Sequence, residues 1–187
     1  MHDIEPHYHW RHLYMAEEDP RSIFFGRTYS EFEFSQAVYN YFIHPQWDEF
    51  GSKTLYLKIL FADYDAKFAI IEIIGEWNDA IENDIMELKR EVLDKLMEEG
   101  IFKFIMIAES VFSFHSGDKD YYEEFYDEVA DENGWAVLIN FHQGAQHDFL
   151  LRKLNRYIEL MEIPAWRTFK PEDFFQLIDD KISQRLL

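Results

Sequence analysis

The sequence predicts an α/β fold in which a mainly parallel central sheet begins with a hairpin strand and is covered by helices. Three observations support this prediction. Apolar runs rich in β-branched and aromatic residues recur along the chain, as in "KFAIIEIIG" and "WAVLINF". Amphipathic stretches alternate with these runs, and parallel strands buried on both faces have this near-continuous apolar character. Finally, 48% of the 187 residues are hydrophobic and 18% are aromatic, which is enough for a sizeable core.

Residues 1–53 are predicted to form an N-terminal extension with one helix. Residues 1–29 show no sustained hydrophobic period. A helix is predicted over about 31–43, because Ser30 and Glu33 have capping-box spacing and Pro45 follows the segment. Five apolar residues recur on one face of that helix: Phe34, Ala37, Val38, Tyr41 and Phe42.

Residues 54–187 are predicted to form the main α/β domain. "TLYLKILF" and "KFAIIEIIG" read as two strands that "ADYDA" joins in a hairpin. A helix follows over 79–98, with Asp79 and Glu82 as a capping box and Gly100 at its end. The apolar residues expected to face the core from this helix are Ile81, Ile85, Leu88, Val92 and Leu96.

The second half of the chain continues the alternation. "IFKFIMIAESVFSF" opens as a buried strand, and an acidic helix follows and ends at Asn133-Gly134. "WAVLINF" is the next strand, and a third helix is marked by Leu150, Leu154, Tyr157, Ile158 and Met161. A short strand is expected over about 164–168. The last helix begins at Pro171, with two acidic residues in its first turn.

The net charge of the chain limits the classes of partner that it is expected to bind. The net charge is −19, and residues 76–132 contain 18 acidic but only 5 basic residues. Such a field repels phosphate backbones, so no nucleic-acid partner is expected. The acidic stretch is either a pair of solvated helix faces or a docking surface for a basic partner.

Other function classes are excluded by what the sequence lacks. No run approaches the ~18 apolar residues of a membrane span. There is no cysteine, so a disulfide, a thiolate metal site and a cysteine nucleophile are all excluded. The N-terminus does not read as a secretory signal, and a cytoplasmic location is expected. No Gly-x-Ser-x-Gly or glycine-rich phosphate loop occurs.

Two stretches resemble a known domain type. "IIEIIGEWNDA" resembles a strand end that commonly reads Gly-Glu-Leu-Asp-Ala, where Gly75 and Glu76 match while Trp77 and Asn78 differ. "ESVFSFHSG" resembles the pattern Asp-x-Ser-x-Val-x-Phe-x-Asp-Ser-Ser-Gly, with Ser116-Gly117 at its final pair. On these residues, roughly 54–185 resemble a STAS domain of the SpoIIAA-like type, the fold of bacterial anti-sigma-factor antagonists. The chain would then belong to a bacterial family with an extra N-terminal segment.

The resemblance implies a regulatory domain that binds or releases a protein partner. In the regulatory members, the serine before the final glycine is phosphorylated, and Ser116 is the matching residue. A helix N-terminus favours a phosphate, but four carboxylates that follow Ser116 would repel it: Asp118, Asp120, Glu123 and Glu124.

Two Phe-His-x-Gly stretches, at 114–117 and 141–144, end apolar runs. Because parallel strands end at one edge of a sheet, where α/β proteins bind ligands, we expect a ligand site there. Its candidate residues are Glu76, Trp77, His115 and His142. His115, His142 and His147 are weak metal candidates, because their spacing matches no strong metal motif. The alternative is that the histidines stabilise turns. No metal or other cofactor is predicted.

Glu109 is the carboxylate expected to be partly buried at a strand end. Its pKa would be raised by burial if the side chain is unpaired. The alternative is a structural pair with an arginine or a lysine.

The leading hypothesis is a non-catalytic regulatory or protein-binding domain that acts through its acidic helix face and strand-end loops. The alternative is a small-molecule or metal-binding protein, or an enzyme, with a pocket at the strand C-terminal ends near His115 and His142. The aromatic-rich segment over 24–50 could pack on the domain, form a homodimer or line an apolar-ligand pocket.

Overall fold

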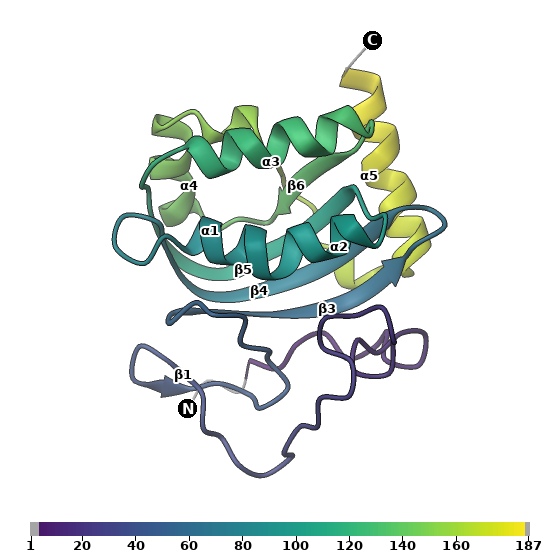
Figure 1. Ribbon diagram of the computed structural model, residues 1–187. Coiled ribbons are helices and arrows are strands. Elements are labelled where there is room, and N and C mark those ends of the chain that lie inside the picture. The colour runs from purple at the N-terminus through teal and green to yellow at the C-terminus, as the bar shows by residue number, and fades with distance from the viewer. Residues whose placement is uncertain (1–3, 186–187) are drawn as a thin grey trace.

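A five-stranded sheet forms the centre of the molecule in a computed structural model that describes residues 4–185 (Figure 1). The strands follow one another in sequence order: β3 (Leu55–Asp63), β4 (Phe68–Asn78), β5 (Lys103–His115), β6 (Trp135–Ile139) and β7 (Glu159–Met161). β3 is antiparallel to β4, and the other three pairs are parallel. The predicted fold class, a mainly parallel sheet with an initial hairpin strand, is confirmed.

Helices cover the two faces of the sheet unequally (Figure 1). One face carries α1 (Asp84–Leu88), the π-helical turn η1 (Lys89–Leu93), α2 (Asp94–Glu98), α3 (Asp120–Asp131) and α4 (Gln143–Leu151). The opposite face carries α5 (Pro171–Arg185), which begins at the predicted proline. Both faces are therefore apolar, which is why the central strands read as continuous hydrophobic runs.

The N-terminal extension contributes to both cores and protects one sheet edge. Trp10 packs with the α5 side of the sheet, whereas Ala16 and Phe24 join the larger core on the other side. Asp48 exchanges two backbone hydrogen bonds with Leu57 of β3, at 2.7 and 3.0 Å. This bridge occupies the Leu57 position of the β3 edge, where the backbone groups of another strand would otherwise pair.

The predicted helix over 31–43 is wrong. This segment forms a small hairpin of β1 (Ala37–Val38) and β2 (Tyr41–Phe42), which lies below β3 in Figure 1. Ser30 does accept hydrogen bonds from the backbone N–H groups of Phe32 and Glu33, but the turn does not propagate. A single capped turn is unstable without an apolar face to bury, and here only Val38 and Ile43 reach a core, beside Trp47, Tyr56 and Ile74.

Two element boundaries in the second half also differ from the prediction. α4 ends at Leu151 because Lys153 takes a left-handed conformation (φ 60°), and the chain re-enters the sheet as β7. The strand predicted over 164–168 is instead the 3-10 turn η3 (Trp166–Thr168). Met161 therefore belongs to a strand rather than to the third helix.

The helix predicted over 79–98 begins later, at Asp84. Gly100 ends it as predicted, with a positive φ of 92° and a hydrogen bond from its N–H to the Met97 carbonyl at 2.9 Å. The assignment of Ile81 to the inward face is wrong, because Ile81 lies in the preceding loop and is 79% exposed. The division of the chain at residue 53 into an extension and a main domain stays a prediction.

Candidate functional site

Glu76 and His115 meet at the C-terminal ends of the two longest strands. Asn78 of β4 pairs with His115 of β5, and Glu76 pairs with Ser113. The Glu76 carboxylate oxygen Oε1 lies 3.2 Å from Nε2 of His115. The structure thus brings together two of the four residues predicted for a ligand site, in a position that solvent reaches.

A bulge in β5 beside these residues places Phe112 in solvent. Gly75 pairs with Val111 and Glu76 with Ser113, so Phe112 has no partner in β4. An extra residue of this kind redirects the side chains around it. Phe112 is 41% exposed, although its neighbours Val111 and Phe114 are buried.

The β1–β2 hairpin reaches the same edge. The Tyr39 hydroxyl lies within hydrogen-bond distance of Ser113 Oγ, at 2.9 Å. Ile81 is tied to this region as well, because Ala80 N–H donates to the His115 carbonyl at 3.2 Å. We call Tyr39, Ile81, Phe112, His115 and Ser116 the strand-end surface.

Trp77 lies beneath this surface. Its side chain is fully buried, and its indole N–H donates to the Asp79 carboxylate at 2.9 Å. Trp77 therefore supports the loops from inside the core instead of facing solvent.

Asp79 is the centre of a buried polar network that sequence reasoning missed, because Asp79 was assigned to a helix cap. Its carboxylate accepts from the Trp77 indole, from Ile85 N–H at 2.8 Å and from the Tyr122 hydroxyl at 2.5 Å. Burial raises its pKa to about 6, against the effect of these three donors. The one available signal was an acidic residue directly after a buried strand.

Asp84 forms a second part of this network. It is fully buried and accepts from Asn78 N–H at 2.7 Å and from the Ser52 hydroxyl at 2.7 Å. Its pKa is raised by burial. The two carboxylates fix the loop between β4 and α1, and with it the position of Ile81.

Ser116 lies in the loop between β5 and α3, held from two sides by α4 and its C-terminal flank. Its N–H donates to the Asp148 carboxylate at 2.9 Å, and its hydroxyl accepts from Arg152 Nε at 3.1 Å. The Ser116 N–H lowers the pKa of Asp148. Gly117 is required beside it, since a Cβ there would come within 2.5 Å of the Asp79 carbonyl oxygen.

His142 of the second Phe-His-x-Gly stretch and the nearby His147 take separate positions. His142 is the N-cap of α4, where its Nδ1 accepts from Gly144 N–H at 3.2 Å. His147 is exposed on the same helix. Among residues 4–185, no group of three or more His, Asp or Glu side chains could hold a metal ion.

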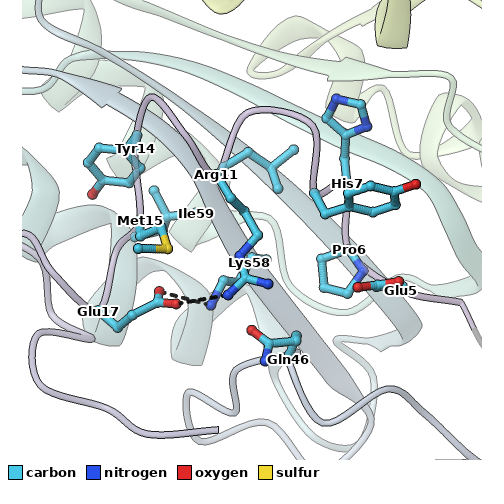
Figure 2. Close-up of a pocket in the computed structure, with 12 residues that line it drawn as sticks. Glu5, Pro6, His7, Arg11, Tyr14, Met15, Glu17, Gln46, Lys58 and Ile59 are labelled. Atoms are coloured by element: carbon cyan, nitrogen blue, oxygen red, sulfur yellow. Dashed lines mark hydrogen bonds and ion pairs between the residues drawn. The ribbon is translucent and has the colours of Figure 1, made fainter. Parts of the chain in front are cut away.

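A separate hollow is lined by residues of the N-terminal segment and of β3 (Figure 2). The side chains of His7, Arg11, Glu17, Gln46 and Lys58 line it. Lys58 is 6% exposed and pairs with Glu17 at 3.2 Å and with Asp48 at 3.4 Å. The enclosed space admits about one water molecule, so a larger ligand does not fit without rearrangement.

Glu109 forms a structural pair with an arginine, which the sequence analysis gave as the alternative. Its carboxylate accepts from the Arg167 guanidinium and from the Trp166 indole N–H. Burial acts to raise its pKa, but the hydrogen bonds from Arg167 and Trp166 prevail, and the pKa is lowered. Glu109 is a structural ion pair on the α5 side of the sheet.

Glu72 is a further buried carboxylate that the sequence did not reveal, because it lies in the apolar run of β4. It is 1% exposed and accepts the backbone N–H of His7 at 2.7 Å. Burial raises its pKa to about 7. Glu72 thus fixes the N-terminal segment to the second face of the sheet.

Glu72→Gln is expected to stabilise the protein above pH 7 and to change little below pH 4.5. The folded-state pKa of Glu72 is raised, so its carboxyl contributes stability that is present below the unfolded pKa and is lost as the pH rises through about 7. Glutamine keeps an acceptor for His7 N–H without the buried charge. Urea unfolding at pH 8 should show a gain of about 1–3 kcal/mol.

Glu109→Gln is the matched control and should destabilise the protein at pH 8, since the pKa of Glu109 is lowered. Equal stability of the parent and Glu72→Gln at pH 8 as well as below pH 4.5 would contradict the prediction.

Comparison with known proteins finds solved structures that are similar to this chain. No family model matches the sequence, and no curated protein matches it. The crystal structure of a proposed anti-sigma factor antagonist from Thermotoga maritima is similar, with a TM-score of 0.43 and 17% identity over 58% of this chain and 86% of that one. The NMR structure of the same protein, TM1081, has a TM-score of 0.41 and 17% identity over 68% of this chain and 89% of its own.

Within residues 4–185, no helix is both long and apolar enough to cross a membrane.

Proposed function

We propose that this protein is a non-catalytic regulatory domain that binds a protein partner through the strand-end surface and the adjoining acidic face of α3. The observation that carries the proposal is the exposure of Ile81 and Phe112 near the C-terminal ends of β4 and β5, where Glu76, His115 and Ser116 supply polar groups. Exposed apolar side chains with a polar rim are typical of protein interfaces. The cytoplasmic location expected from the composition is part of the proposal.

The chemistry of α3 suggests the kind of partner. Asp120, Glu123, Asp127 and Asp131 are exposed on this helix, which begins directly after the Ser116 loop. Glu124 and Glu128 of the same helix are partly neutralised by Lys89, at 3.2 and 2.8 Å. An acidic face that continues an apolar surface fits a partner with apolar anchors and basic side chains.

The double variant Ile81→Ser, Phe112→Ser is expected to weaken partner binding by about tenfold or more, because interface energy concentrates in a few apolar anchors. Both side chains are exposed, so the fold should be retained. The partner recovered from native extract with the parent protein would be identified by mass spectrometry and titrated against each variant.

Leu13→Ser, Phe25→Ser is the matched control, since these side chains are 48% and 57% exposed elsewhere on the molecule. It should bind as the parent does. If both double variants bind equally well, or if the protein turns over a small substrate and no partner is recovered, the proposal fails.

Ser116 is proposed as the residue that regulates this binding. A phosphate on its hydroxyl would gain the Arg152 guanidinium but face the Asp148 carboxylate, which now accepts the Ser116 N–H. Repulsion at Asp148 would move the loop that carries His115 and Gly117.

Ser116→Asp is therefore expected to reduce affinity for the partner by roughly tenfold, whereas Ser116→Ala leaves it close to that of the parent. Titration of both variants against the same partner measures this difference. Equal affinities for the two variants, together with unmodified Ser116 after incubation in extract with ATP, would remove Ser116 from the proposal.

A further inference from the structure

A second surface lies at the far edge of the sheet, beside β7. A hollow of about 760 Å³ opens there between the C-terminal half of α3 and that of α5. The C-terminal end of α3 lies next to α5 in Figure 1. Leu160 of β7 lines the hollow, together with Val129 of α3 and Ile182 of α5. The space thus continues the plane of the sheet between the two helical layers.

The backbone along this edge is unpaired on its outer side. β7 is the last strand of the sheet and pairs only with β6, over Val137–Ile139. Trp135 and Ala136, at the start of β6, pair with β5 but have no partner in β7. Within residues 4–185, no backbone hydrogen bond joins the outer side of β7 to another segment. Unpaired N–H and C=O groups on an edge strand are a template for a further strand.

Among the charged side chains that line the hollow, one cation has no ion-pair partner among the described residues. The two carboxylates are already paired, Glu159 with Arg185 and Asp179 with Lys103. Arg156 also lines the hollow, yet it forms no ion pair or side-chain hydrogen bond with any described residue. Lys153, exposed three residues before it in the chain, is equally unpaired among residues 4–185. Arg156 and Lys153 are therefore free to pair with an incoming carboxylate.

We infer that β7 accepts an extended segment of a partner protein as a sixth strand, and that this segment carries alternating apolar and acidic side chains. The backbone groups of β7 pair with the segment. Its apolar side chains enter the hollow beside Ile182 on the α5 side of the sheet, and its carboxylates, on the opposite face of the added strand, meet Arg156. In binding of this kind, main-chain hydrogen bonds provide the affinity and alternate side chains provide the specificity. At the β3 edge, by contrast, Asp48 already pairs with Leu57.

The test uses a labelled synthetic peptide of about eight residues in which valine and glutamate alternate, roughly 26 Å long when extended. It is titrated against the full chain by fluorescence anisotropy, and amide hydrogen exchange is followed in parallel. The peptide is expected to bind and to slow exchange at Glu159–Met161. Arg156→Glu should weaken binding by about fivefold to tenfold, because attraction becomes repulsion.

Lys170→Glu is the matched control, since it makes the same change in net charge at an exposed site outside the hollow and should leave binding unaltered. A peptide with lysine in place of glutamate should bind the parent weakly and Arg156→Glu better. The inference is overturned if the acidic peptide does not bind, if Lys170→Glu weakens it as much as Arg156→Glu, or if protection falls outside β7. Sedimentation showing that a second copy of the chain fills this edge would also overturn it.

Discussion

Gly75→Ala is expected to lower the free energy of unfolding by about 4 kcal/mol or more, the largest loss among the single substitutions considered. Gly75 has a φ of 128°, which a residue with a side chain rarely adopts. A Cβ there would come within 2.0 Å of the Thr54 carbonyl oxygen, which belongs to the backbone beside β3 and cannot move alone. Backbone strain and steric overlap therefore add together.

Gly100→Ala separates these two contributions. Gly100 also has a positive φ, of 92°, but no atom lies within 4 Å of a Cβ built on it. It should lose only about 1–2 kcal/mol, from strain alone. Urea unfolding of both variants measures the difference, and losses of equal size would show that the contact with Thr54 is relieved by relaxation of the sheet.

Gly75→Ala should also impair partner binding in any fraction that remains folded. Gly75 pairs with Val111 at the bulge that exposes Phe112, so displacement of the β4 backbone alters the strand-end surface directly. The same glycine thus connects the stability of the sheet to its proposed function.

Asp79→Ala is the second large effect expected, with a loss of about 3–5 kcal/mol. The substitution leaves three buried donors without their acceptor, namely the Trp77 indole, Ile85 N–H and the Tyr122 hydroxyl. Relief from burying a carboxylate offsets part of this loss above pH 6, because the pKa of Asp79 is raised to about 6. Guanidinium unfolding at pH 7 measures the net loss.

Tyr122→Phe is the control for this network. It removes one donor while Asp79 keeps the other two, so the expected loss is only about 1 kcal/mol. If Asp79→Ala costs no more than Tyr122→Phe, Asp79 is not the common acceptor on which the loop between β4 and α1 depends.

Much of the fold could be predicted because its signals are local. The apolar runs of β4, β5 and β6 identify strands buried on both sides, and Pro171 and Gly100 mark a helix start and a helix end. The hairpin at 37–42 could not be predicted, since the capping pattern at Ser30 is local and the choice against a helix depends on contacts with Trp47 and Tyr56.

The candidate site was predicted in part for the same reason. The order of parallel strands places Glu76 and His115 at one edge, and their side chains lie 3.2 Å apart. Phe112 and Asp79 were missed, because the exposure of one and the burial of the other follow from a shift in strand register and from loop packing. Neither property leaves a periodic pattern in the sequence.

The sequence by itself therefore determined the alternation of strands and helices, the parallel sheet and the edge at which polar side chains gather. Only the tertiary structure decided which carboxylates are buried, which partner each one has and which apolar side chains stay in solvent. Arg167 lies 58 residues from Glu109, and the His7 N–H lies 65 residues from Glu72. Periodicity reports the average environment of a segment, whereas charge pairing and exposure depend on atoms that the fold brings from distant positions.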